Sequence, residues 1–134
     1  MIVLDEQLLG RGIDEEISLW YRGSVVFVRD LRPNTLVKDD AIPQLLQKER
    51  QPAFVTINAK DFWRKVPADK RFCMVCFPIR DRDVPEIPTL LRNLFTREGF
   101  QTKAGRSGHI FRVTLEGRVR FYRWDGTPEY DLML

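Results

Sequence analysis

Acidic residues stand where predicted strands of this chain give way to helices and where predicted helices begin. These positions are Asp5, Asp39, Asp40 and Asp61, and Asn58 lies three residues before the last of them. Carboxylates that come together repel one another unless a cation lies between them. Mg²⁺ and Mn²⁺ prefer such oxygen ligands, and a bound metal can polarise a phosphodiester and lower the pKa of an attacking water. The acids therefore suggest metal-dependent phosphodiester chemistry.

Each acid also has a purely structural explanation when it is taken alone. Asp is a preferred N-cap that stabilises a helix by about 1 kcal/mol, and Asn is a preferred turn former. However, Ser, Thr and Asn cap helices comparably well, so capping does not predict an acid at every one of these positions. On the pattern alone, capping and a metal cluster both stay open.

The elements that must position these residues alternate along the chain. Apolar runs predict strands at 2–4, 24–28, 53–57, 72–77, 109–115 and 118–124. Amphipathic or capped segments predict helices over 13–21, from Asp39 or Asp40 to residue 50, in a short turn from Asp61, and over 87–99. The order predicts an α/β fold with a mostly parallel sheet, helices on both faces and a C-terminal β-hairpin at one edge.

In such a fold the carboxyl ends of the first and third strands lie at one edge of the sheet, where ligands bind. Acids far apart in the sequence can therefore converge there, and Asn58 can add an amide oxygen or orient a water. Four basic residues flank the proposed site and can hold phosphates, although a solvated helix face explains each of them equally well. They are Arg11, Lys60, Arg64 and Lys65.

Length, composition and charge restrict the classes of protein to which this chain can belong. The 134 residues, 43% hydrophobic and 31% charged, predict one soluble globular domain. The chain has no apolar run of roughly 20 residues for a bilayer and no visible signal peptide, so we expect a cytoplasmic protein without a membrane partner. Residues 1–62 carry 8 Lys and Arg against 10 Asp and Glu, whereas residues 63–134 carry 14 against 9. The basic half permits a polyanionic partner without requiring one.

Other reactive residues predict no chemistry. Cys73 and Cys76 lie in one apolar run and should point to opposite faces of a strand, so we expect two free thiols in the core. His109 is the only histidine, and we expect it at the surface. Neither a catalytic triad nor a Gly-rich phosphate loop is indicated.

Three segments, 3–8, 39–42 and 55–62, together resemble the small stand-alone PIN-like proteins, relatives of the PIN-domain ribonucleases of bacterial toxin–antitoxin pairs. The most specific parts are Asp5-Glu6-x-Leu8 and Thr56-x-Asn58-x-x-Asp61-Phe62. The resemblance covers residues 1–125 as one PIN-like nuclease domain and leaves 126–134 as a C-terminal tail. Leu132, Met133 and Leu134 in this tail could dock on the core, on a twin subunit of a homodimer, or on nothing.

The resemblance implies a three-layer α/β/α sandwich with an Mg²⁺ or Mn²⁺ site that cleaves RNA, and a small antitoxin protein as regulator. Asp5 and Asp61 match the metal-binding acids of the family, and Asp39 matches the acid that opens its second helix. Thr56 and Asn58 match the polar positions beside them. A fuller nuclease site has four carboxylates, for which Glu6 or Asp40 would supply the fourth here.

Two main hypotheses follow. The chain is a metal-dependent endoribonuclease of PIN-like type, or it is a catalytically silent RNA-binding or partner-binding module on the same fold. Another Mg²⁺-dependent phosphoryl-transfer enzyme on a similar sheet is the remaining alternative.

Overall fold

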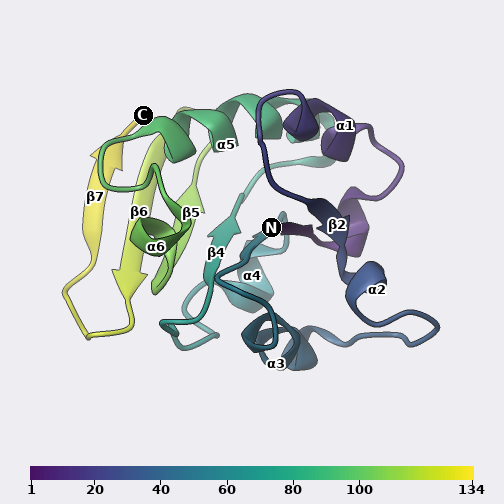
Figure 1. Ribbon diagram of the computed structural model, residues 1–134. Coiled ribbons are helices and arrows are strands. Elements are labelled where there is room, and N and C mark those ends of the chain that lie inside the picture. The colour runs from purple at the N-terminus through teal and green to yellow at the C-terminus, as the bar shows by residue number, and fades with distance from the viewer.

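Short apolar runs form one seven-stranded sheet in the computed structural model, which describes residues 1–134 (Figure 1). The strands are β1 (Ile2–Leu4), β2 (Val25–Phe27), β3 (Ala53–Thr56), β4 (Cys73–Cys76), β5 (His109–Val113), β6 (Arg118–Arg123) and β7 (Tyr130–Met133). Their order is β2-β1-β3-β4-β5-β6-β7, parallel from β2 to β5 and antiparallel for β6 and β7. The expected α/β class and mostly parallel sheet are confirmed.

Most helices are short. They are α1 (Ile13–Ser18), α2 (Val28–Leu31), α3 (Ile42–Gln47), α4 (Ala59–Phe62), α5 (Ile87–Thr96) and α6 (Lys103–Arg106), with 3-10 helices at Glu6–Leu8, Asp39–Ala41 and Asp81–Glu86. Two of them were not predicted: α6 lies between predicted elements, and α2 begins at Val28, the last residue of a predicted strand. Thr102 explains the start of α6, because its hydroxyl accepts a hydrogen bond from the Gly105 amide at 3.0 Å. None of the helices has the length and apolar character needed to cross a membrane.

The strands carry apolar side chains to both faces of the sheet, because successive residues of a strand point in opposite directions. Ile2 and Leu4 of β1 belong to a core cluster with buried residues of α1 and α5. Val3 belongs to a second cluster with buried residues of α2, α3 and α4. Figure 1 shows α1 and α5 above the sheet and α3 and α4 below it. Cys73 and Cys76 fall into different clusters and are buried and free, as expected.

Strand β1, second from one edge of the sheet, has β2 on one side and β3 on the other, so the direction of winding changes between β1 and β3. Leu4 pairs with Val55, and the carboxyl ends of these two strands therefore lie side by side. In open α/β sheets this switch point, outside the carboxyl ends of the strands, is where ligands bind. The topology places the residues after β1 and β3 there.

The C-terminal residues form a strand where we expected only a tail. Strand β7 pairs with β6, and Leu132 and Leu134 pack against the core cluster of α1 and α5. The β5–β6 hairpin is therefore covered by β7 and is not itself the edge of the sheet. A run of only four residues, three of them exposed, is too short to predict this strand.

The prediction that His109 lies at the surface is wrong, since only 7% of this residue is exposed. Its ring stacks on Phe111 with centroids 5.4 Å apart and lies edge-on to Phe100. Nδ1 lies 3.0 Å from the Arg106 carbonyl oxygen. The residue is a core aromatic at the beginning of β5.

The docking of β7 can be tested with two neighbouring residues. Leu132→Ala should lower the free energy of unfolding by about 1.5 kcal/mol, below the range of roughly 2–5 kcal/mol for fully buried leucines, because Leu132 is only partly buried. Met133→Ala, at a side chain that is 53% exposed, should change it by less than about 0.5 kcal/mol. Urea unfolding measures both. Equal effects of the two substitutions would show that β7 does not pack on the core.

Candidate functional site

The first part of the candidate site is a hydrogen-bonded pair at the ends of β1 and β3. Residues two apart in a strand point to the same face of the sheet. Asp5 therefore lies on the same face as Val3, and Thr56 on the same face as Phe54, which is the face covered by α3 and α4. The Thr56 hydroxyl donates to Asp5 Oδ2 at 2.7 Å. Asp5 is only 6% exposed and Thr56 is fully buried. A buried carboxylate requires such a partner.

Asn58 joins this pair to the two other acids. Its backbone amide donates to Thr56 Oγ1 at 2.9 Å. Its side-chain Nδ2 donates to Asp39 Oδ2 at 3.1 Å and to Asp61 Oδ2 at 2.8 Å. The structure thus brings five sequence-predicted residues from three separate segments into one network. They are Asp5, Asp39, Thr56, Asn58 and Asp61.

Capping does not account for the acids of this network. Asp5 occupies the N-cap position of a 3-10 helix but makes no side-chain capping bond. Asp39 is already inside its helix, whose N-cap is Lys38, which corrects the expected N-cap at Asp39 or Asp40. Asp61 lies within α4, where Asn58 is the N-cap residue and also makes no side-chain capping bond. Instead, Thr56 donates a hydrogen bond to Asp5, and Asn58 donates to both Asp39 and Asp61.

The network raises the pKa of two of its carboxyls above their ordinary value of 3.8. For Asp5 the main cause is burial, which the Thr56 hydroxyl and the nearby amides of Glu6 and Gln7 oppose. Asp39 is an exposed residue, but partial burial of its carboxyl is again the largest cause, followed by the charges of Asp5 and Asp61. Every neighbour that acts on Asp39 raises its pKa. The site therefore concentrates negative charge, and none of its acids forms an ion pair.

The side chains offer the hard oxygen donors that Mg²⁺ and Mn²⁺ prefer. However, no group of three or more His, Cys, Asp or Glu side chains in the structure is arranged to hold a metal ion. The Asn58 amide bridges Asp39 and Asp61 through its nitrogen, a donor that cannot bind a metal. The chemistry of the acids fits a divalent cation, and binding would require the carboxylates to turn away from this amide.

The two candidates for a fourth acid differ in their surroundings. Glu6 accepts a hydrogen bond from the backbone amide of Arg29 at 2.7 Å, at the start of α2, and this contact gives it a structural role. Asp40 lines a cavity of about 390 Å³ next to two network acids. The cavity is lined by Asp39, Asp40, Pro43, Asp61, Lys65, Val66 and Pro67.

The four basic residues predicted to hold RNA are placed unequally. Lys65 lines the same cavity as Asp39 and Asp61. Arg64 forms an ion pair with Glu129 at 2.6 Å, and Arg11 pairs with Asp81 at 3.0 Å beside a different cavity. Lys60 is exposed on α4. Lys65 is therefore the base best placed to meet a phosphate at the acids.

Sequence reasoning missed the residues that support the far wall of this cavity. The Tyr122 hydroxyl of β6 donates to the Val66 carbonyl oxygen at 2.6 Å and accepts from the Arg64 amide at 3.2 Å. The Tyr122 ring also lies 5.1 Å from that of Trp63, centroid to centroid. Trp63, Arg64 and Val66 follow Asp61 closely in the sequence, but Tyr122 lies 56 positions beyond Val66. No local spacing signals such a contact.

Comparison with known proteins adds no relative. The chain matches no protein-family model, no curated protein and no solved structure.

The repulsion within the network makes a prediction about stability. Asp5 and Asp39 bind protons more tightly in the folded protein than in the unfolded chain, so the free energy of unfolding should fall as the pH rises from below 3.8 through their raised pKa values. Asp39→Asn keeps an oxygen that can accept from Asn58 and removes the charge. It should raise the free energy of unfolding at pH 7, by less than about 1 kcal/mol because Asp39 is exposed and its charge is screened.

Urea unfolding from pH 3 to pH 8 measures this effect. The matched control is Asp40→Asn, which removes the neighbouring charge at a residue outside the hydrogen-bonded network and should shift the curve less. A loss of stability in Asp39→Asn at pH 7 would mean that the charge of Asp39 stabilises the fold, as capping requires.

Proposed function

We propose that this chain is a metal-dependent endoribonuclease of PIN-like type, built as a three-layer α/β/α sandwich. The observation that carries the proposal is the network that joins Asp5, Asp39 and Asp61 through Thr56 and Asn58. It lies at the carboxyl ends of β1 and β3, where such sheets bind ligands. Capping bonds do not explain its acids. The resemblance of the three segments around these residues to PIN-like proteins supports the same function.

In this proposal Asp5, Asp39 and Asp61 would hold Mg²⁺ or Mn²⁺. When bound, the metal would polarise the phosphodiester and lower the pKa of the attacking water. Thr56 orients Asp5 through its hydroxyl, and Asn58 positions Asp39 and Asp61 through its amide. Lys65, which lines the adjoining cavity, neutralises a phosphate of the RNA backbone.

The resemblance implies that the enzyme is the toxin of a cytoplasmic toxin–antitoxin pair. A small antitoxin protein would then regulate the enzyme.

The proposal predicts that Asp61→Asn abolishes RNA cleavage and leaves the fold intact. The substitution keeps the shape of the side chain and an oxygen that accepts from Asn58, while it removes the charge that would attract the metal. Cleavage of single-stranded and hairpin RNA should require millimolar Mg²⁺ or Mn²⁺. The metal should also raise the thermal midpoint of the wild-type protein and not that of the variant, because a ligand of the native state stabilises it.

Glu98→Gln, which removes an exposed acid outside the network, is the matched control and should keep both the cleavage and the metal-dependent rise. Cleavage that persists in Asp61→Asn would exclude the proposed site. Cleavage without added metal, and undiminished by a chelator, would exclude the proposed chemistry.

A catalytically silent RNA-binding or partner-binding module is the second candidate function. The observation that favours it is the Asn58 amide, which satisfies Asp39 and Asp61 without a metal, together with the absence of a ready-made ligand group. Such a module should tolerate Asp61→Asn. It should instead lose RNA affinity in Lys65→Ala, with a shallower dependence on salt because one phosphate contact is lost.

A further inference from the structure

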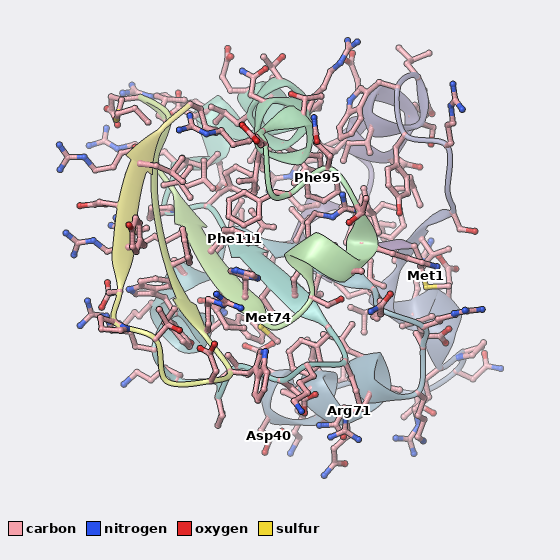
Figure 2. All side chains as sticks on the ribbon, turned by 60° about the vertical axis from the view of Figure 1, so that its left-hand side comes forward. Met1, Asp40, Arg71, Met74, Phe95 and Phe111 are labelled. Atoms are coloured by element: carbon pink, nitrogen blue, oxygen red, sulfur yellow. The ribbon has the colours of Figure 1, made fainter.

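A second polar site lies at the amino-terminal ends of the parallel strands, opposite to the ends that carry the acidic network. Its central residue is Arg106, the last residue of α6. Helix α6 is the element before β5, and two residues separate Arg106 from the start of that strand. In Figure 2, Phe95, whose ring lies against the Arg106 guanidinium, is in the upper half of the view, and Asp40, which lines the cavity next to the acidic network, is at the bottom. This site and the acidic network therefore occupy different ends of the molecule.

Arg106 is buried without a counter-charge. Only 6% of the residue is exposed, and it takes part in none of the six ion pairs of the protein. The one hydrogen bond of its side chain runs from Nη1 to the Phe100 carbonyl oxygen at 3.0 Å. The Nε atom is buried and has no partner. A guanidinium has five N–H donors, so most of its donor capacity is unused.

The surroundings of Arg106 contain no acid that would compensate for this burial. Burial lowers the pKa of the guanidinium, and only the Cys73 thiol and the Tyr21 hydroxyl act in the opposite direction. The Phe95 ring lies 3.9 Å from the guanidinium carbon, and its face offsets part of the cost. Lys103 adds further positive charge to this region, as its effect on the Met1 amino group shows. An uncompensated buried charge is costly, and proteins normally pair it.

Arg106 lines a cavity of about 290 Å³, three of whose eight lining residues are aromatic. The lining residues are Trp20, Tyr21, Arg22, Gly23, Phe95, Thr96, Gln101 and Arg106. The rings of Trp20, Tyr21 and Phe95 meet edge to face, with centroids 6.0 to 6.2 Å apart. The indole Nε1 of Trp20 is a second buried donor without a partner.

The fit of Tyr21 in this wall depends on Gly23. A Cβ atom at position 23 would lie 2.7 Å from the Tyr21 ring, so any larger residue would displace the ring. Arg22 and Gln101 are exposed at the rim and carry further N–H donors. The cavity therefore combines flat apolar walls, two unused buried donors and a positive field.

We propose that this cavity binds a small organic anion, whose carboxylate or phosphate group pairs with Arg106 and whose flat apolar part lies against the aromatic walls. A planar guanidinium can donate two parallel hydrogen bonds to either group, and the Trp20 indole can donate another. The volume suits a ligand with one ring. The inference is independent of the ribonuclease proposal, because the two sites share no residue.

Calorimetric titration of the full chain with benzoate and with phenyl phosphate tests this site and distinguishes the two acid groups. Benzamide, a neutral probe of the shape of benzoate, is the matched control ligand and should not bind. In an NMR spectrum the indole N–H signal of Trp20 should move on binding, whereas those of Trp63 and Trp124 should stay in place. Trp20→Phe identifies the signal.

Arg106→Gln should weaken binding of the preferred anion by at least about tenfold, since a charge-assisted pair is lost. Arg22→Gln changes only an exposed residue of the rim, so this variant should fold even if Arg106→Gln does not. It should weaken binding about threefold. Arg118→Gln, at an exposed residue of β6, should leave the affinity unchanged. The wild-type thermal midpoint should rise with the anion and not with benzamide.

The proposal is wrong if neither anion binds at concentrations up to about 10 mM, a Kd that corresponds to only about −3 kcal/mol. It is also wrong if benzamide binds as well as benzoate, or if both Arg22→Gln and Arg106→Gln bind like the wild type. In those cases Arg106 serves the fold alone, through Phe95 and Phe100.

Discussion

The parallel pairing of β1 with β3 is the constraint on which the rest of the structure depends. The amide of Asp5 donates to the Val55 carbonyl oxygen at 3.0 Å, so the first residue beyond β1 is still held by the neighbouring strand. This register places the Thr56 hydroxyl 2.7 Å from the Asp5 carboxyl. A slip of one residue would turn Thr56 to the other face of the sheet and leave a buried carboxylate without its partner. The sheet and the candidate site therefore require the same register.

Asn58 extends this constraint from the sheet to the helices beneath it. Its backbone is tied to Thr56 and its side chain to Asp39 and Asp61, so three segments of the chain meet at one residue. Because burial and mutual repulsion raise the pKa of Asp39, the arrangement costs stability that the two apolar clusters must supply. A fold selected for stability alone would gain by replacing one of these acids with an amide. The three acids lower stability and are present nevertheless, which is the physical reason to look for a ligand at this site.

The sequence predicts the parts of this structure that follow from periodicity and order. Apolar runs locate six of the strands, and the alternation of strands with helices brings Asp5, Asn58 and Asp61 to one edge without any contact being known. Strand β7 and helix α6 escape prediction, because each has only four residues and owes its conformation to tertiary contacts. The same holds for Tyr122, whose bond to Val66 joins elements distant in sequence. Arg106 gives no signal either, since an unpaired arginine is recognisable only once its burial is known.

The two polar sites share a cause in the architecture of the sheet. Strands β1, β3 and β4 are buried on both faces, so their side chains pack and cannot meet a ligand. Apart from Thr56, the last residue of β3, the polar groups of both sites therefore come from the segments that enter and leave the strands. The leaving segments place carboxylates around Asn58, and the entering segments place Arg106 among aromatic rings. Neither the acids of the network nor Arg106 forms an ion pair, whereas five other arginines pair with acids. Under the two proposals, these opposite charges at the two ends of one sheet attract two ligands of opposite sign.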